Sequence, residues 1–363
     1  MNSKVKVAVG LSGGVDSSVS ALLLKEAGYD VIGLTMKIFD ESFEVSENSK
    51  HACYGPGEDE DIEMAEKMCG ILDIPFHVLD LCREYEHHVL DYFRNEYVSG
   101  RTPNPCVVCN NKLKFGFLID KARDTGINFD YFATGHYARI EKVENRYLLK
   151  KAVDASKDQT YFIYTLTSNL LSKIMFPLGS MTKDRVREKA KELDIEIAFR
   201  PESQDFIAGG DYSPLFKDVK VQPGDIIDEE GNVLGRHNGI MYYTVGQRRG
   251  LGIGGREKPL YVLKIDVENN RVVVTDREGL FSEGLIANDI RLSAIDILDK
   301  PYKINARIRQ NSKEAPATLY PFDDNRAKVV FDDPQYSITP GQSVVFYDGE
   351  IVFGGGIIEE PIV

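Results

Sequence analysis

Leu11-Ser12-Gly13-Gly14-Val15-Asp16-Ser17-Ser18 is the stretch that decides the fold, and it follows an alternating apolar run from Val5 to Val9. A strand that stops at two glycines and opens into an apolar helix directs backbone N–H groups and a helix N-terminus toward one small space. Such a space suits an anion, and the glycines let the backbone approach phosphate groups closely. The stretch therefore predicts a phosphate-binding turn between a strand and a helix.

The polar side chains of this turn favour pyrophosphate chemistry. Ser12, Ser17 and Ser18 supply hydroxyl donors, and Asp16 is expected to cap the helix or to help hold Mg²⁺. The turn lacks the lysine of a Walker A loop and is similar to the loop of ATP pyrophosphatases, which split ATP into AMP and pyrophosphate. The alternative is a glycine turn that only allows close packing, which needs neither three serines nor an aspartate.

Length and charge limit the class of protein. The 363 residues carry 44 basic and 57 acidic side chains, a net charge of −13, which disfavours a polyanionic partner over the whole surface. Residues 232–258 nevertheless carry five basic side chains against one acidic side chain, so a local basic surface is expected. No window is apolar enough to cross a bilayer and no signal-type segment is present, which predicts a cytoplasmic protein without a membrane partner.

Apolar strand-like and helical runs alternate up to about residue 199, which predicts parallel strands joined by crossover helices. We expect an α/β fold, a doubly wound parallel sheet of the ATP-pyrophosphatase type, over residues 1–205. Short glycine-punctuated strands then predict a small β-rich central domain over residues 206–282 and a C-terminal β-barrel over residues 283–363. One helix is expected from Phe115 to Asp124, and another begins after Thr182 as its N-cap.

Cys106 and Cys109 lie in the segment Asn-Pro-Cys-Val-Val-Cys-Asn, residues 104–110. Such a pair binds metal, exchanges disulfides or carries a persulfide, and an odd count of five cysteines in a reducing compartment is not a disulfide framework. A structural zinc site needs a second pair, and none follows at zinc-finger spacing. The prolines before Cys106 fix the loop, so we expect functional thiols whose pKa values are lowered at a loop–helix junction.

A set of segments resembles, in order and over almost the whole chain, those of the tRNA-specific 2-thiouridylases. The segments are residues 12–18, 33–37, 100–110, 134–139, 157–161, 201–205, 243–252, 339–343 and 354–358. The ordered set is far more specific than any one glycine motif. The resemblance implies an enzyme that thiolates C2 of the wobble uridine in the tRNAs for Lys, Glu and Gln, after ATP has adenylated the 2-oxygen. The base must leave the anticodon stack to reach such a site.

The resemblance also implies site residues. Catalytic roles fall to Cys109, Cys106 and Asp16. ATP is expected at Gly10, Leu11, Ser12, Gly13, Gly14, Val15, Asp16, Ser17, Met36 and Gly135. The target base is expected at Asn104, Pro105 and Cys106, and other parts of the tRNA at His136, Lys157, Asp158, Gln159, Arg309, Gln310 and Gln342. His136 by itself is more typical of a satisfied core histidine.

The chain departs from the family pattern at two positions. Many members carry aspartate where this chain has Cys106, and a second catalytic cysteine shortly after the Ser-Gln-Asp segment, where residues 206–210 here read Phe-Ile-Ala-Gly-Gly. The usual relay, in which Cys109 attacks while a distant cysteine delivers a persulfide sulfur, is therefore broken in this sequence.

Two mechanisms of sulfur delivery are compatible with a sequence that lacks the second cysteine. In the first, Cys106 and Cys109 form the persulfide and resolving pair within one loop. In the second, Cys106, Cys109 and a third thiol bind three irons of a [4Fe–4S] cluster whose fourth iron holds a sulfide. Cys53, in the loop after the second strand, is the best third ligand and Cys82 the reserve, whereas Cys69 lies on an apolar helical stripe and is expected in the core.

Two competing functions remain open. Another adenylating ligase with a pyrophosphatase loop would not need a Cys-x-x-Cys pair beside a barrel that accommodates RNA. A non-catalytic RNA-binding protein that only senses ATP would not need these thiols or Asp16. For the thiolation reading, the expected partners are the anticodon stem-loop of the tRNA and a sulfur donor, which is either a persulfide carrier protein or sulfide.

Overall fold

The computed structural model describes residues 4–40, 52–193, 205–207, 212–217, 219–254, 258–323 and 325–362. The chain divides into two compact units. The first contains Met1–Val89, Cys106–Leu215 and Glu350–Val352, and the second contains Leu90–Pro105, Phe216–Gly349 and Phe353–Val363. The boundary between Pro105 and Cys106 falls inside the Cys-x-x-Cys segment. The division into three domains expected from the sequence stays a prediction.

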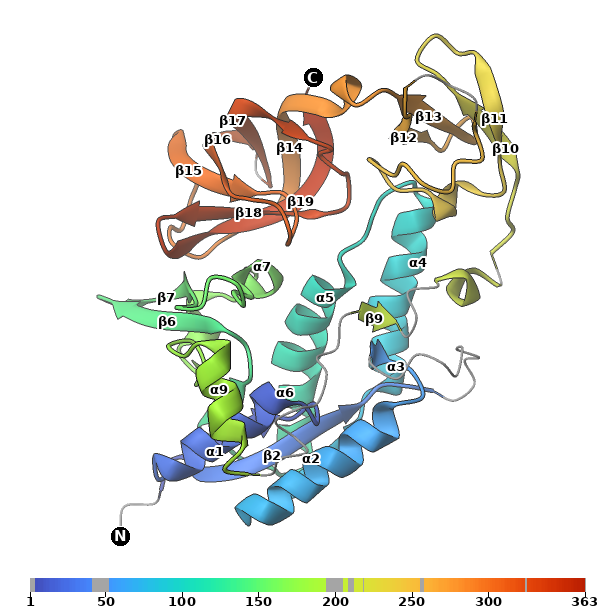
Figure 1. Cartoon of the computed structure of the whole chain (residues 1–363). Coiled ribbons are helices and arrows are strands. Elements are labelled where there is room, and N and C mark those ends of the chain that lie inside the picture. Colours follow the sequence, from blue (N-terminus) through green and yellow to red (C-terminus); the bar gives the residue numbers. More distant parts are fainter. Residues whose placement is uncertain are drawn as a thin grey trace. The chain divides into compact units, whose positions relative to one another are not determined.

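A parallel sheet organises the first unit (Figure 1). Its strand order is β4 (Phe76–Asp80), β2 (Asp30–Lys37), β1 (Lys6–Gly10), β5 (Tyr131–Thr134) and β8 (Ile174–Met175). Every recorded pairing in this sheet is parallel. The order runs outward in both directions from β1, so the sheet is doubly wound and its switch point lies between β1 and β5. Ligands of such sheets bind at the carboxyl ends of these two strands.

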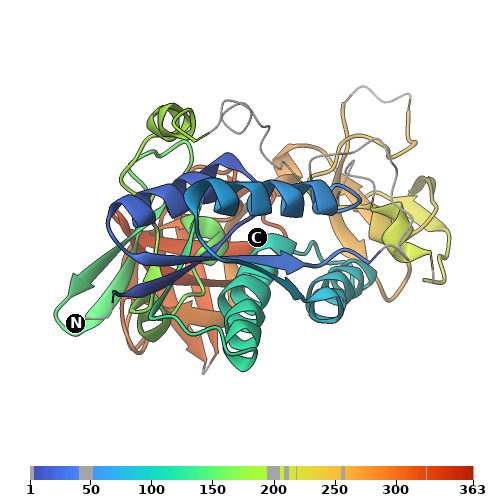
Figure 2. The same cartoon turned by 90° about the horizontal axis from the view of Figure 1, so that it is seen from below.

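Helices cover both faces of this sheet. In Figure 2, α1 (Val15–Glu26) and α2 (Glu58–Leu72) lie on one face, and α6 (Leu118–Asp124) lies on the other. The helix α9 (Lys183–Ala190) packs against α1. The core between α1, α2 and the sheet includes Val7, Val9, Val19, Met68 and Cys69, so the core position predicted for Cys69 is confirmed.

The remaining elements of this part of the chain are short. They are β3 (Ala52–Tyr54), α3 (Cys82–Tyr85), η1 (Glu86–Leu90), α5 (Pro105–Val108), η2 (Cys109–Phe117), β6 (Ala138–Val143), β7 (Arg146–Lys151), α7 (Thr160–Ile163), α8 (Ser168–Leu171) and β9 (Asp205–Ile207). Two sequence expectations need correction here. The helix expected from Phe115 begins ten residues earlier, because α5, the π-helix η2 and α6 form one continuous run. Cys53 lies in strand β3 rather than in a loop, because β3 pairs with β9.

A small sheet occupies the middle of the second unit. Its order is β11 (Val233–His237), β10 (Gly224–Ile227), β13 (Arg271–Thr275) and β12 (Tyr261–Asp266), around a core that includes Ile226, Val262, Val272 and Val274. The helix α4 (Asp91–Val98) and the 3-10 turns η5 (Ile240–Tyr242) and η6 (Glu278–Leu280) complete the non-barrel part, and η4 (Ser213–Phe216) spans the boundary between the two units in the sequence. The strands β12 and β13 form an antiparallel hairpin, and Asn270 in its turn has a positive φ of 51°.

A closed β-barrel ends the chain. It contains β14 (Phe281–Leu292), β17 (Arg326–Tyr336), β16 (Ala315–Asp323), β15 (Tyr302–Arg307), β18 (Ser343–Asp348) and β19 (Ile351–Ile362), in that order. Pairing of β14 with β19 closes the ring. Leu285, Leu319, Val329, Val344 and Phe346 fill its core. The predicted fold class is therefore confirmed. No helix in the described part of the chain is long and apolar enough to cross a membrane.

Leu285 gives a test of the barrel core. It is fully buried on β14, so Leu285→Ala leaves a cavity and is expected to lower barrel stability by about 2–5 kcal/mol. Hydrogen exchange of the amides in β14–β17, read by mass spectrometry, measures this local free energy. Ile297→Ala is the matched control, because Ile297 is 72% exposed. Equal exchange in both variants would contradict the assignment of Leu285 to the barrel core.

Candidate active site

The predicted phosphate turn joins β1 to α1. Gly14 is the N-cap of α1, and no side chain caps this helix. The Ser12 N–H donates to Ser17 Oγ at 3.2 Å, and Ser17 Oγ donates to Gly14 O at 3.1 Å. Ser18, however, is buried and its hydroxyl donates to Gly14 O at 2.9 Å. Ser17 and Ser18 therefore both use their hydroxyls to stabilise the turn, which leaves the helix N-terminus and Ser12 as the anion-binding part, and an ATP contact by Ser17 stays a prediction.

Asp16 is held by two partners from distant segments. Lys183 Nζ lies 2.8 Å from Oδ1 and 2.9 Å from Oδ2 of Asp16, and the Tyr137 hydroxyl donates to Oδ1 at 2.8 Å. The expectation that Asp16 caps the helix is wrong, because its carboxylate turns to this lysine and tyrosine. A Mg²⁺ ion bound by Asp16 would compete with the Lys183 ammonium, since both need the same oxygens.

Gly135 lies where β5 passes close to the phosphate turn. A Cβ on Gly135 would lie 2.8 Å from the backbone of both Asp16 and Ser17, so a side chain at this position would displace the turn. The close approach brings the ends of β1 and β5 together at the switch point, as ATP binding there requires. Met36, the third residue expected to contact ATP from outside the turn, lies near the end of the neighbouring strand β2 and is half-buried.

His136 follows Gly135 and is buried. Its Nδ1 lies 2.8 Å from Thr134 Oγ1, and its ring contacts the rings of Phe115 and Phe176. Burial, with a smaller effect of Lys114, lowers the pKa of His136 to about 3, so the ring is neutral at physiological pH. These contacts are those of a core histidine, and a tRNA contact by His136 stays a prediction.

The segment Lys157–Gln159 uses two of its three side chains to hold the local backbone. Asp158 is buried and accepts from the Ala152 N–H at 2.8 Å and from the Thr160 hydroxyl at 2.5 Å. Gln159 Oε1 accepts from the Tyr137 N–H at 2.9 Å. The half-buried Lys157 is the side chain of this segment that is best suited to a phosphate, and the tRNA contacts expected here stay a prediction.

The Cys-x-x-Cys pair lies where α5 gives way to a π-helix. Cys106 is in α5, and Cys109 is the first residue of η2, whose wider turn places Lys114 one π-helical turn after Cys109. Both thiols are half-buried. The Asn110 side chain donates to the carbonyl of Phe162 at 3.2 Å and ties this helix to α7. A π-helix inside a helical run is often found at functional sites.

A third cysteine lies in the same region. Tyr85 is fully buried, and its hydroxyl is within electrostatic range of Cys109, Cys53 and Cys106, which together with burial raise its pKa. Tyr85 stacks on Tyr54, with ring centres 5.2 Å apart, and Tyr54 follows Cys53 in β3. The structure therefore brings Cys53 toward the Cys-x-x-Cys pair.

The strand β3, which contains Cys53, pairs with β9, the strand near which many family members carry their second cysteine. Ala52 pairs with Asp205 and Tyr54 with Ile207, so Cys53 lies opposite Phe206. In many members of the resembled family the second cysteine follows the Ser-Gln-Asp segment, and β9 begins at the last residue of that segment. Residues 201–204 and 208–210 lie outside the described parts of the chain. Cys53 thus occupies the strand beside the position at which the usual second thiol is absent.

The thiols have raised, not lowered, pKa values. Burial raises the pKa of Cys109 to about 11, although the positive charge of Lys114 lowers it in part. The expectation of a lowered pKa at a loop–helix junction is therefore wrong for Cys109, because loss of solvent outweighs the nearby charge. Burial likewise raises the pKa values of Cys69 and Cys82 to about 12. The Cys82 sulfur contacts the carbonyls of Lys37 and Phe39, which marks it as structural.

The described residues contain no preformed metal site. Among them, no group of three His, Cys, Asp or Glu side chains is placed to hold a metal ion. Cys53, Cys106 and Cys109 therefore do not form a ready three-ligand set for a single ion. The [4Fe–4S] alternative requires these thiols to adjust around the cluster.

The loop expected to hold the target base is fixed by the barrel within the second unit. Gln342 Nε2 donates to the carbonyls of Thr102 and Pro103 at 3.2 and 2.9 Å. A Cβ on Gly341 would lie 2.8 Å from Thr102 O. Asn104 is buried, and its N–H donates to Tyr92 Oη at 3.3 Å. The amide of Gln342 thus positions the loop that carries Asn104 and Pro105, and direct contact of these residues with tRNA stays a prediction.

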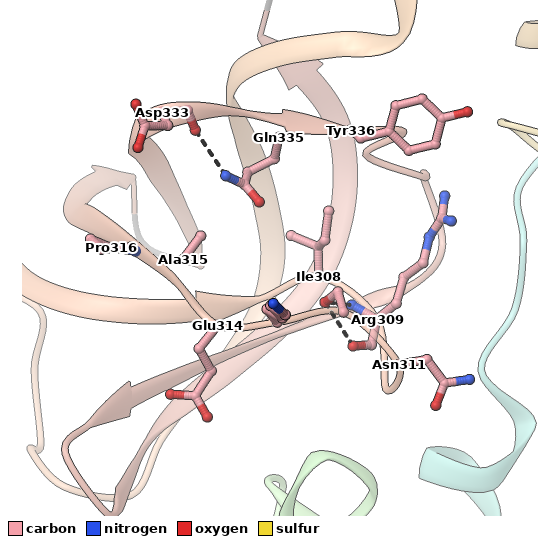
Figure 3. Close-up of a pocket in the computed structure, with 11 residues that line it drawn as sticks. Ile308, Arg309, Asn311, Glu314, Ala315, Pro316, Asp333, Gln335 and Tyr336 are labelled. Atoms are coloured by element: carbon pink, nitrogen blue, oxygen red, sulfur yellow. Dashed lines mark hydrogen bonds between the residues drawn. The ribbon is translucent and has the colours of Figure 1, made fainter. Parts of the chain in front are cut away.

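A cavity of about 480 Å³ opens on the barrel beside Arg309 (Figure 3). Its lining combines charged and polar side chains, among them Lys313, Glu314, Asp333, Gln335 and Tyr336. Arg309 Nη2 donates to Ser337 Oγ at 2.8 Å and also to Thr339 Oγ1. Arg309 therefore helps to hold the barrel loops, and the tRNA contacts expected from Arg309 and Gln310 stay a prediction.

Comparison with known proteins identifies the class of protein. Residues 5–208 match the family model described as tRNA methyl transferase HUP domain. Residues 214–276 match the tRNA methyl transferase PRC-barrel domain, and residues 282–358 match the aminomethyltransferase beta-barrel domain. The chain therefore belongs to a class of tRNA-modifying proteins. Its α/β nucleotide-binding part matches the HUP domain.

Full-length relatives define the family more narrowly. The chain is 48% identical to the tRNA-specific 2-thiouridylase MnmA of Acetivibrio thermocellus, over 98% of this chain and 100% of the relative. It is 47% identical to the MnmA of Clostridium botulinum, over 99% of both chains, and 46% identical to that of Clostridioides difficile, over 98% of this chain and 99% of the relative. The chain belongs to the tRNA-specific 2-thiouridylase family and is an enzyme of that family.

Three residues of this site were missed by the sequence reasoning. The sequence singles out none of Lys183, Tyr85 and Lys114. The one available signal was the absence of a lysine in the phosphate turn, which implies that a cation must come from elsewhere. Nothing in the sequence indicates which of the 44 basic residues supplies it.

Lys114 gives a test of the thiol electrostatics. Lys114→Met removes the charge that lowers the pKa of Cys109, so the pKa should rise and alkylation at pH 9 should slow severalfold, because less thiolate is present. Iodoacetamide modification of Cys109, followed by peptide mass spectrometry, measures the rate. Lys112→Met on the same helix is the control, because its exposed charge does not act on Cys109. An unchanged rate in Lys114→Met would show that this charge does not reach the thiol.

Proposed function

We propose that this protein catalyses the ATP-dependent 2-thiolation of the wobble uridine in the tRNAs for Lys, Glu and Gln. The observation that carries the proposal is the combination, within one compact unit, of a phosphate turn at the sheet switch point and a cluster of three cysteines. The full-length relatives are named tRNA-specific 2-thiouridylases, which supports the same substrate.

One chain of contacts joins the two halves of this site. Gly135 touches the turn at Asp16 and Ser17, and His136 follows it. Lys114 acts electrostatically on both His136 and Cys109. These interactions support a single site that contains both the phosphate turn and Cys109.

The chemistry requires both halves. The 2-oxygen of uridine is a poor leaving group, so it must first attack the α-phosphorus of ATP and release pyrophosphate. The helix N-terminus of α1 binds the departing pyrophosphate. A sulfur nucleophile then adds at C2, and AMP leaves with the former 2-oxygen. Where Mg²⁺ is bound with ATP, Asp16 is the carboxylate at the turn that can hold it, in exchange for its present partners.

Cys109 delivers the sulfur in this proposal, and the sulfur has two alternative forms, a persulfide or a cluster-bound sulfide. In the persulfide form, Cys106 completes the pair with Cys109. In the cluster form, Cys53, Cys106 and Cys109 would hold a [4Fe–4S] cluster, which would supply a bound sulfide as nucleophile. The raised pKa of Cys109 disfavours its free thiolate as the attacking group at neutral pH, whereas a persulfide is a stronger acid.

Three other functions are less consistent with the site. A methyl transferase, as the family models are described, has no use for a turn that binds pyrophosphate. An adenylating ligase that acts on a carboxylate would leave the thiol cluster without a role. A non-catalytic RNA-binding protein would leave both the phosphate turn and the thiol cluster without a role.

Cys109→Ala is expected to abolish thiolation while tRNA-dependent release of pyrophosphate continues, because the phosphate turn is untouched. Thiolation is measured by the retardation of tRNA in mercury-containing gels, and pyrophosphate by an enzyme-coupled assay. Cys82→Ser is the control, since the Cys82 sulfur is held by the carbonyls of Lys37 and Phe39 and by Asp80, outside the pair that delivers sulfur. If wild-type protein with tRNA releases no pyrophosphate, the proposed function fails. If Cys109→Ala no longer binds ATP, the cysteine is structural.

Iron content separates the two forms of sulfur delivery. Protein purified without oxygen is assayed for iron, acid-labile sulfide and visible absorption. Near-stoichiometric iron that is lost in Cys106→Ala and in Cys53→Ser, but kept in Cys82→Ser, would establish the cluster with Cys53 as third ligand. An iron-free protein that still thiolates tRNA would leave the persulfide pair as the mechanism.

A further inference from the structure

Lys183 is almost wholly buried, with 6% of its surface exposed. Its ammonium contacts both carboxylate oxygens of Asp16 and lies 5.8 Å from the centre of the Tyr137 ring. The backbone N–H of Lys183 donates to Asp154 Oδ2 at 2.9 Å, which fixes the start of α9. A positive charge is thereby held at the second residue of α1, whose N-terminus forms the phosphate turn.

A purely structural role does not explain this lysine well. Burying an ion pair costs desolvation that its attraction only partly offsets, and an apolar pair of similar size is often at least as stabilising. The same two helices already share a more exposed ion pair, in which Lys189 Nζ lies 2.8 Å from Glu26 Oε1. The buried pair is the one at the end of α1 where phosphates are expected.

The phosphate turn itself lacks a cation. No lysine or arginine occurs between Val7 and Leu24, so backbone N–H groups and hydroxyls alone face the pyrophosphate within this segment. Pyrophosphate carries several negative charges, and phosphate sites generally supply a lysine, an arginine or a metal ion to balance them. Lys183 comes from a segment 167 residues after Asp16, yet its ammonium lies beside the turn.

We propose that Lys183 is the phosphate-binding lysine of this enzyme: its ammonium stabilises the pyrophosphate part of ATP, and Asp16 positions that ammonium. The inference rests on the proposed adenylation. In that step the uridine 2-oxygen attacks the α-phosphorus, and the bond from this phosphorus to the oxygen that bridges to the β-phosphorus breaks. The electron pair of that bond leaves on pyrophosphate, where the ammonium stabilises the developing charge.

The first experiment measures binding of inorganic pyrophosphate by titration calorimetry in EDTA, so that neither tRNA nor Mg²⁺ is needed. Lys183→Met should weaken binding about 10- to 100-fold, the usual loss of a charge-assisted contact. Lys189→Met, which removes the other ion pair between α9 and α1, should bind as wild type. Equal binding by wild type and Lys183→Met would overturn the proposal.

A double variant separates direct binding from simple neutralisation of Asp16. If Lys183 only cancels the Asp16 charge, then Lys183→Met combined with Asp16→Asn should regain wild-type binding, and the proposal is wrong. If Lys183 contacts pyrophosphate, the double variant stays at least tenfold weaker than Asp16→Asn alone. Should Lys183→Met fail to fold by circular dichroism, Lys183→Gln keeps a polar side chain without the charge and gives the same comparison.

Turnover provides a second readout. In tRNA-dependent AMP formation, Lys183→Met should lower kcat and raise KM for ATP while KM for tRNA is unchanged, because the ammonium acts on the phosphates alone. A loss of stability without this pattern would show a structural role and overturn the proposal. Absence of AMP formation by wild-type protein would refute the proposed function itself, and the pyrophosphate titration would still decide the role of Lys183.

Discussion

The close approach of β5 to the phosphate turn is the constraint on which the site depends. Gly135 lies so near the backbone of Asp16 and Ser17 that a Cβ would lie 2.8 Å from it. This contact fixes the ends of β1 and β5 against each other at the switch point. Tyr137, two residues later, donates to Asp16, so the same segment also orients the carboxylate of the turn.

Charge is distributed in this site through residues that are far apart in the chain. Lys183 faces Asp16 at the turn, while Lys114 acts on Cys109 and on the neutral His136. Each lysine lies in a partly or largely desolvated place, where a charge acts more strongly than in water. The two cations therefore match the two stages of the proposed reaction, loss of pyrophosphate and attack by sulfur.

Several polar residues that the family resemblance assigns to tRNA binding also make hydrogen bonds within the protein. Asp158 and Gln159 hold backbone N–H groups, and Gln342 holds the loop that carries Asn104. A residue that positions a binding loop and a residue that touches the ligand produce the same sequence motif. Contacts within the protein alone therefore leave the direct tRNA contacts as predictions, while they explain why these side chains are polar and fixed.

The sequence by itself determined the phosphate turn, the doubly wound sheet, the β-rich remainder and the family, because each depends on residues that are contiguous or periodic along the chain. Only the tertiary structure decided which lysine reaches Asp16, since 167 residues separate the two. It also reversed the expected pKa shift of Cys109, because burial is a property of packing and not of local sequence. It placed Cys53 beside β9 through a strand pairing that involves only three residues on each side, too short to produce a pattern in the sequence.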